Sequence, residues 1–364
     1  MWNGDTDCEE AGMLRKMVFW IVPVAVVALA TGCSKGEKPK FTAGVVEDPA
    51  TGWHVITLSY NAPNPSEAVS VKICPEGGSN LFSFTFGGVE LLRQPDSLRQ
   101  LQGRGYGTLI LYPTPNRVRN AQFTWEGKTY TFPANWHEHF IHGLVRDKPW
   151  SYEQPVADEH SARVRTWIDF EPGTPQYKFF PWRSRLSLTF TLSADGLEIR
   201  YEVRNQDTRA LPYGFATHPY FNVLGSRDQT FLWVPAQAHM EAVNYLPTGE
   251  LVPLEGTPYD VRRPTPLSKL NLDDVFWGMT PDKPMGWEAR DKGIRMTLSA
   301  SAEFTHAVVY TPPTKPLFCM ENQTCSTDAH NLYAKGFQKA AHLLIVQPGT
   351  SQSGWVRFLP FRID

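Results

Sequence analysis

The chain has 364 residues, of which 41% are hydrophobic and 13% aromatic, and its formal net charge is -2. This length is sufficient for one domain with a large core, because an all-β sandwich can exceed about 250 residues. The near-neutral charge and the lack of a basic stripe argue against a nucleic-acid partner. Twelve tryptophans suit a protein that stacks against sugars, although a sandwich core also contains many rings.

Residues 1–32 have the pattern of an export signal. Arg15 and Lys16 precede the uncharged run MVFWIVPVAVVALA (17–30), which is too short to span a bilayer as a mature helix. Four acidic residues stand ahead of the basic pair, so we expect translation to start at Met13.

The run LATGC, which ends at Cys33, resembles a bacterial lipoprotein box. It implies that Cys33 carries lipid and that the protein lies on the periplasmic face of a bacterial membrane, in contact with that membrane only through the lipid. An uncleaved anchor or an ordinary signal peptide is the alternative.

Residues 33–45 are rich in lysine, glycine and proline, which predicts a flexible tether before a domain that spans 46–364. Lipid on Cys33 leaves an odd number of thiols, Cys74, Cys319 and Cys325, so no disulfide framework is expected. Cys319 and Cys325 could form a disulfide, but buried free thiols are the preferred interpretation.

Short strand patterns dominate the domain, and 30 prolines argue against long helices. Alternating residues predict strands at 53–60 and at 81–92, the second with a Gly-Gly turn. The clearest hairpin is 184–205, where two alternating apolar faces flank the turn Ala194-Asp195-Gly196.

Two further strand pairs are predicted later in the chain. One joins 294–298 to 307–310, and the other joins 343–346 to 355–358 across a Pro-Gly turn. The predicted fold is therefore all-β, a large antiparallel β-sandwich with long functional loops.

Four stretches contain side chains suited to proton transfer and substrate binding. An imidazole, with an ordinary pKa near ~6.5, is well suited to pass a proton at neutral pH. Each candidate alone would more often be a core or surface residue, but Glu321 follows three apolar residues, and an unpaired buried carboxylate is costly. The stretches are GTLILYPTPNRV with Arg117, HEHFIHGLVRDKPW with His142, YGFATHPYFNVLG with His218 and LFCMENQ with Glu321.

In this order, the four stretches resemble the aldose 1-epimerase (galactose mutarotase) family. The matching motifs are Asn116-Arg117, His142-Gly143, THPYFN (217–222) and Glu321. The resemblance covers nearly the whole domain and implies a galactose mutarotase-like supersandwich. It also implies an isomerase that interconverts the α and β anomers of a free hexose and needs no cofactor.

The resemblance implies a role for each residue. Glu321, charged at pH 7, takes the proton of the O1 hydroxyl, and His218, held protonated by its surroundings, gives a proton to the ring oxygen. Arg117 and His142 bind the sugar. Asp273, in LDDVFWG (272–278), matches a carboxylate that holds hydroxyls distal to the reacting carbon, and Asp274 is the alternative if the register differs by one.

The match is incomplete after His142-Gly143, where the family commonly has a second glycine. Here the run continues to Arg146, and this spacing is similar to that of relatives that act on hexose 6-phosphates. Arg146 is therefore expected to contact a substrate anion or to pair with Asp147 or another carboxylate. A free aldose is the first choice, because an exported protein rarely meets sugar phosphates.

Two rival functions remain open. A carbohydrate-binding lipoprotein could keep the fold and the cleft without turnover, since fold does not determine activity. A module of a polysaccharide-degrading enzyme is less favoured, because the paired carboxylates of glycoside hydrolysis are not evident.

The histidines of HEHFIH (137–142) do not have the zinc-protease spacing. On a strand, His137 and His139 would share one face while His142 takes the other register, so no metal site is predicted. Three tryptophans could line a sugar cleft or fill the sandwich, and are not assigned to the site: Trp136, Trp150 and Trp182.

Overall fold

The computed structural model describes residues 39–364, so the expected export signal and Cys33 lie outside the described residues. Within that range no helix combines the length and the apolar character needed to cross a bilayer. The first strand, β1, begins at Phe41 and pairs along its whole length with β2. The expected boundary of the tether at residue 45 is therefore wrong, because residues 41–45 belong to the folded sheet.

A five-stranded antiparallel sheet opens the domain, and it contains both strands predicted at 53–60 and 81–92. The turn at Gly87 and Gly88 places Phe86 opposite Val89, as the Gly-Gly pattern predicts. The strands, in sheet order, are β1 (Phe41–Glu47), β2 (His54–Tyr60), β3 (Val69–Cys74), β4 (Asn80–Phe86) and β5 (Val89–Glu90).

The largest sheet has ten strands and contains the predicted hairpin 184–205. Ser193 lies opposite Gly196, and the alternating apolar residues of both strands are buried. The strands are, in order, β11 (Ser151–Tyr152), β13 (Ser161–Phe170), β14 (Ser184–Ser193), β15 (Gly196–Asn205), β28 (Ser351–Arg362), β24 (Ile294–Ala300), β23 (Met285–Ala289), β18 (Thr230–Trp233) and β21 (Thr265–Pro266), with β12 (Val156–Ala157) paired to β13.

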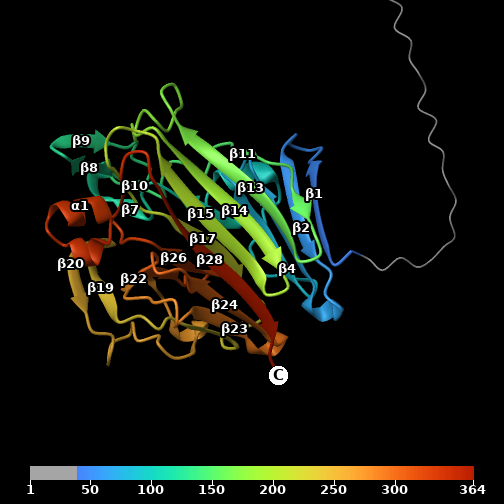
Figure 1. Ribbon diagram of the computed structural model, residues 1–364. Helices are drawn as coiled ribbons and strands as arrows, with labels where there is room; N and C mark the ends of the chain where they lie inside the picture. Colours follow the sequence, from blue (N-terminus) through green and yellow to red (C-terminus); the bar gives the residue numbers. More distant parts are fainter. Residues whose placement is uncertain (1–38) are drawn as a thin grey trace, which may run out of the picture. The chain divides into compact units, whose positions relative to one another are not determined.

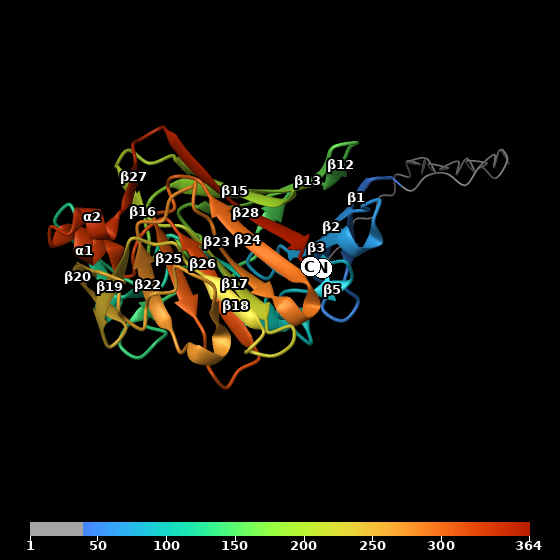
Figure 2. The same cartoon turned by 90° about the horizontal axis from the view of Figure 1, so that it is seen from below.

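A seven-stranded antiparallel sheet packs against the ten-stranded sheet (Figures 1 and 2). Its strands are, in order, β20 (Leu246–Val252), β19 (Ala238–Val243), β22 (Asp273–Trp277), β25 (His306–Tyr310), β26 (Leu317–Gln323), β17 (Ala216–Asn222) and β6 (Thr108–Leu111).

Aromatic side chains from the two large sheets meet in the core. Phe221 of β17 lies 5.3 Å from Trp287 of β23 and 6.4 Å from Phe358 of β28, measured between ring centroids. Since successive side chains of a strand point to opposite faces, burying Phe221 leaves His218 and Tyr220 on the other face of the seven-stranded sheet. The predicted all-β sandwich is confirmed, and its core orients the candidate residues.

Short elements complete the described residues. They are the ribbons β7 (Arg117–Val118) with β10 (Phe140–Ile141), β8 (Gln122–Trp125) with β9 (Lys128–Thr131) and β16 (Leu211–Tyr213) with β27 (Leu344–Val346); the helices α1 (Ala329–Ala334) and α2 (Gln338–Ala341); and the 3-10 turns Pro65–Glu67, Leu98–Gln102, Arg119–Ala121, Leu267–Lys269 and Arg290–Lys292.

The two later strand pairs were predicted with the wrong partners. β24 pairs with β23 and β28, whereas β25 lies in the other sheet between β22 and β26. Likewise β27 pairs with β16, and β28 pairs with β15 and β24. All four strands exist. β24 and β25 each pair with one neighbouring strand of the chain and one distant strand, whereas the partners of β27 and β28 are all distant in sequence.

The three cysteines within the described residues are buried free thiols. Cys319 and Cys325 do not form a disulfide, which agrees with the preferred interpretation of the sequence.

Candidate active site

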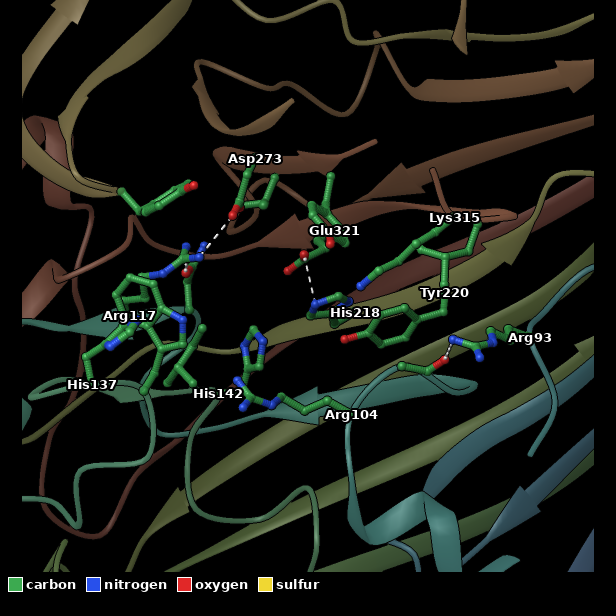
Figure 3. A pocket seen from close by; sticks show the side chains of 18 residues that line it. Arg93, Arg104, Arg117, His137, His142, His218, Tyr220, Asp273, Lys315 and Glu321 are labelled. Carbon is green, nitrogen blue, oxygen red and sulfur yellow. Dashed lines mark hydrogen bonds and ion pairs between the residues drawn. The ribbon is translucent and has the colours of Figure 1, made fainter. Parts of the chain in front are cut away.

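A cavity of about 570 Å³ lies on the face of the seven-stranded sheet opposite the core (Figure 3). This volume falls within the range of about 300–1,000 Å³ that is usual for small-molecule sites. All five residues predicted from the sequence line it: Arg117, His142, His218, Asp273 and Glu321.

His218 and Glu321 come from neighbouring strands. Thr217 lies opposite Asn322 and Tyr220 opposite Cys319, and this register brings His218 of β17 opposite Glu321 of β26. The imidazole Nε2 and the carboxyl Oε1 are 3.2 Å apart, and both side chains are buried. The imidazole also stacks on Tyr220, with 4.5 Å between ring centroids.

Burial shifts the two pKa values in opposite directions. It lowers the pKa of His218 to about 3, and the positive charge of Arg117 acts in the same direction. It raises the pKa of Glu321 to about 8, although the hydrogen bond from Gln323 opposes this shift. Because burial penalises the charged form of each group, the neutral pair is favoured at pH 7. The charged pair expected from the sequence is therefore wrong as the resting arrangement.

Gln323 orients the carboxyl group of Glu321. The two residues stand two apart on β26, and Gln323 Nε2 donates a hydrogen bond of 2.8 Å to Glu321 Oε2. The other oxygen, Oε1, is thereby left facing His218. Gln323 was not predicted from the sequence, although its spacing of two along an expected strand was an available signal.

Arg117 and His142 are brought together by the short β7–β10 ribbon. Ile141 pairs with Arg117, and the amide of His142 donates a hydrogen bond of 2.9 Å to the carbonyl of Asn116. His142 and Gly143 both have a left-handed backbone, with φ of 70° and 66°. A Cβ at Gly143 would lie 2.4 Å from the carbonyl oxygen of Tyr112, so only glycine fits there.

His142 presents a buried, neutral imidazole to the cavity. Its ring is perpendicular to that of His218, with 4.9 Å between centroids. Burial lowers the pKa of His142 well below its ordinary range, and the adjacent His218 contributes in the same direction. Its Nδ1 has no hydrogen-bond partner in residues 39–364, so a polar ligand atom could supply one.

Asp273 lies at the start of β22, opposite Tyr310 of β25, and its carboxylate accepts a hydrogen bond of 2.9 Å from Arg117 Nη2. Asp274 instead forms an ion pair of 2.9 Å with His239, and it does not line the cavity. The structure thus places Asp273, and not the alternative Asp274, in the site.

Two aromatic rings enclose the guanidinium of Arg117. Its Cζ lies 4.5 Å from the ring centroid of Trp136 and 4.8 Å from that of Tyr245, in the β19–β20 turn. Both rings line the cavity, whereas Trp150 and Trp182 are buried in the core. Trp136 is therefore a site residue that the sequence analysis left out, and no pattern pointed to Tyr245.

Arg146 is outside the cavity lining and has no carboxylate partner within residues 39–364. Its Nη1 donates to the carbonyls of Gln102 and Gly103, at 3.0 and 3.1 Å, and Asp147 pairs with Lys148 instead. The expected ion pair between Arg146 and Asp147 is wrong.

Residues 136–139 form a tight turn instead of a strand, with Trp136 bridged to His139 and a left-handed φ of 51° at His137. His139 Nδ1 accepts a hydrogen bond from the amide of Asn120. The described residues contain no cluster of three or more side chains able to hold a metal ion.

Comparison with known proteins gives results for sequence and for fold. A family profile described as aldose 1-epimerase matches residues 64–359. A galactose mutarotase of Rattus norvegicus is 30% identical over 177 residues, which are 46% of this chain and 49% of that protein. The chain thus spans about half the length of this curated relative.

An uncharacterized protein of Escherichia coli, YphB, is 25% identical over 66% of this chain and 79% of its own. The crystal structure of a galactose mutarotase-like protein from Clostridium acetobutylicum superposes with a TM-score of 0.77. The superposition covers 89% of this chain and 98% of the Clostridium acetobutylicum chain, at 21% sequence identity. This likeness concerns the fold alone.

Proposed function

The chain belongs to the aldose 1-epimerase family, and from this premise we propose that it interconverts the α and β anomers of a free hexose by opening and closing the pyranose ring. The observation that carries the proposal is the buried 3.2 Å contact between His218 Nε2 and Glu321 Oε1 on the cavity wall. Ring opening needs one group that accepts the O1 proton and one that protonates the ring oxygen, and these two side chains are close enough to serve one pyranose.

The proposed reaction uses the one titratable proton of the pair, which near neutral pH is carried by the carboxyl group of Glu321. Transfer of this proton from Glu321 to His218 gives a carboxylate and an imidazolium without exchange with solvent. The carboxylate then accepts the proton of the O1 hydroxyl while the imidazolium protonates the ring oxygen. The bond between C1 and the ring oxygen breaks as the C1 carbonyl forms.

Ring opening returns the pair to its neutral form, with Glu321 protonated and His218 uncharged. Burial favours this form, so the two side chains stabilise the complex with the open-chain aldehyde. Rotation about the bond between C1 and C2 exposes the other face of the carbonyl. The same proton transfers in reverse close the ring as the other anomer.

Binding of the sugar is assigned to residues around this pair. Arg117 is held by Asp273 and by the side chain of Asn116, and it retains donors for sugar hydroxyls. The aromatic faces of Trp136 and Tyr245 suit the apolar C–H surface of a pyranose. His142 supplies a neutral imidazole close to the ring oxygen.

Relaxation of freshly dissolved α-D-glucose and α-D-galactose, followed by polarimetry, tests the proposal. Removal of one general acid or base typically costs about 10²- to 10⁴-fold, so Glu321→Gln and His218→Asn are expected to lower kcat/KM by at least about 100-fold. The exposed neighbours Glu159 and His160 offer matched controls, Glu159→Gln and His160→Asn, which are expected to keep the wild-type rate.

Full activity in both site variants would exclude this chemistry. Sugar binding by the wild-type protein without accelerated relaxation would instead support the rival carbohydrate-binding function.

We also propose, from the sequence around Cys33, that the protein is an exported lipoprotein at the periplasmic face of a bacterial membrane. Labelled palmitate supplied to a bacterial host is expected to enter the wild-type protein and not a Cys33→Ser variant. Equal labelling of the two proteins would contradict lipid attachment at Cys33.

A further inference from the structure

The contact between Arg117 and Asp273 is connected to two residues that the proposed function leaves unused. Asp274 follows Asp273 on β22, and its Oδ2 accepts a hydrogen bond of 3.0 Å from the backbone amide of Asp273. Its Oδ1 lies 2.9 Å from Nε2 of His239, which stands on β19. One carboxylate thus joins the backbone that carries Asp273 to a side chain of the neighbouring strand.

Asp274 and His239 lie on the face of the seven-stranded sheet that is turned towards the core. Successive side chains of a strand point to opposite faces, so Asp274 shares its face with the buried Phe276, whereas Asp273 lines the cavity. His239 is paired with Phe276 across the two strands and is only 5% exposed. The pair can therefore affect a bound sugar only through other residues.

The link between the two side chains continues past the end of the strand pairing. The pairing between β19 and β22 ends at His239 and Phe276, and Asp274 stands two residues beyond it, at the end of β22 that carries Asp273. From the same point β19 runs on to the turn that carries Tyr245, and Figure 1 shows β20, β19 and β22 side by side. A side-chain contact thus joins the strands where backbone pairing no longer does.

Both elements that this link joins contact the guanidinium of Arg117. Asp273 of β22 accepts a hydrogen bond of 2.9 Å from Nη2 (Figure 3), and Tyr245 lies 4.8 Å from Cζ. The imidazole of His239 is itself held, because the ring of Tyr259 stacks on it at 3.8 Å between centroids and at an angle of 4°. Separation of β19 from β22 would therefore release Arg117 from two of its contacts.

We propose that Asp274 and His239 are positioning residues for sugar binding, because they hold Asp273 and the β19–β20 turn where both fix Arg117. The inference rests on the proposed function, which assigns Arg117 to the sugar hydroxyls. Side chains that are held before a ligand arrives lose less freedom on binding, so the pair lowers KM. The proposed proton transfers take place on β17 and β26, so kcat depends less on the pair than KM does.

His239→Phe removes the contact with Asp274 and keeps an aromatic ring against Tyr259. It is expected to raise KM for D-glucose and D-galactose about fivefold in the polarimetric assay, which corresponds to the net strength of one ordinary hydrogen bond. We expect a smaller effect on kcat.

The five-stranded sheet offers a matched control. Nδ1 of His54, on β2, lies 2.6 Å from a carboxylate oxygen of Glu76, and its ring lies 5.7 Å from that of Tyr152. His54→Phe therefore makes the same substitution at a histidine that also contacts a carboxylate and a tyrosine, but outside the cavity lining. It is expected to keep the wild-type KM.

Two substitutions of Asp274 separate the contacts of its carboxylate. Asp274→Ala removes both contacts and is expected to raise KM at least as much as His239→Phe, whereas Asp274→Asn keeps an oxygen for the amide of Asp273 and should give an intermediate KM. The side chain of Asp274 is 19% exposed, so Asp274→Ala also provides the test if His239→Phe does not fold.

A double variant distinguishes positioning from a general loss of structure. In an Arg117→Lys protein, His239→Phe is expected to raise KM little further, because the guanidinium that the pair holds is already absent. A defect unrelated to Arg117 would add its full effect on KM to that of Arg117→Lys.

An unchanged KM in Asp274→Ala or in folded His239→Phe would overturn the inference and leave the proposed function intact, as would full additivity with Arg117→Lys. If the wild-type protein binds the sugars without turnover, the Kd from calorimetry replaces KM. If it neither binds nor epimerises them, the proposed function fails, and crystal structures of the wild-type protein and Asp274→Ala decide the inference. Loss of the contact between Arg117 and Asp273 in the variant supports it, and an unchanged contact excludes it.

Discussion

Raising the pH from 6.5 to 8 is expected to remove about 2 kcal/mol of the stabilisation that His218 and Glu321 contribute to the folded domain. The pKa of Glu321 is raised from its ordinary 4.5 to about 8, so its contribution is present at low pH and declines as the pH rises towards 8. The pKa of His218 is lowered from 6.5 to about 3, so its contribution is complete above pH 6.5 and declines as the pH falls towards 3.

The two trends cancel between pH 4.5 and 6.5, where the folded and unfolded forms of the pair each hold one proton. Above pH 6.5 the unfolded histidine loses its proton while the folded pair keeps one until about pH 8. That window of about 1.5 pH units, at about 1.4 kcal/mol per unit, gives the magnitude of about 2 kcal/mol.

Urea unfolding of the wild-type protein and of a His218→Asn/Glu321→Gln double variant measures this contribution. The difference in unfolding free energy between the two proteins isolates the pair from the other titrating groups. It should stay constant between pH 5 and 6.5 and fall by about 2 kcal/mol by pH 8. A difference that stays constant or rises up to pH 8 would refute the neutral pair.

Three further substitutions test contacts that position the residues of the candidate site. Gln323→Ala removes the amide that lowers the pKa of Glu321, so the alkaline limb of the pH profile of kcat/KM should shift to higher pH, and kcat should fall about tenfold. An alkaline limb at the wild-type pH would argue against this contact. Gly143→Ala should lower the free energy of unfolding in urea by more than about 2 kcal/mol, whereas Gly88→Ala, which has a left-handed φ but open space around it, should lower it by about 1 kcal/mol. Equal losses in the two variants would contradict the steric argument. Arg117→Lys should raise KM about tenfold in the polarimetric assay, with a smaller effect on kcat. Lysine can neither form the two guanidinium hydrogen bonds at once nor stack between the two aromatic rings. An unchanged KM would argue against a role for Arg117 in sugar binding.

Local patterns were sufficient to predict strands, but not to predict all their partners. The hairpin 184–205 was predictable because its turn and both apolar faces are contiguous. β24 pairs with β28 across more than 50 residues, and no local signal selects that partner over β25. Side-chain alternation reports which face is buried, whereas pairing between distant strands depends on the packing of the whole sandwich.

The motifs located the residues of the candidate site, but not their protonation. Arg117, His142, His218, Asp273 and Glu321 line one cavity, as their order along the chain led us to expect. The shifts in pKa arise from burial against strands that are distant in sequence, so the charged pair expected from residue chemistry was incorrect.

The contacts around the motifs were harder to predict. Tyr245 and Lys315 reach the cavity from turns that have no motif. Arg104 reaches it from a loop whose carbonyls accept hydrogen bonds from the side chain of Arg146. Such positions follow from tertiary arrangement and leave little trace in the local sequence.

His218 and Glu321, which we propose to transfer protons, project from two hydrogen-bonded strands within a sheet. Arg117, His142, Arg104 and Lys315 stand instead on short ribbons and loops. Substitutions or insertions in those peripheral segments are therefore expected to leave the β17–β26 register unchanged. Under the proposed function, evolution could therefore alter the choice of sugar in such a protein while the proposed ring-opening chemistry is inherited intact.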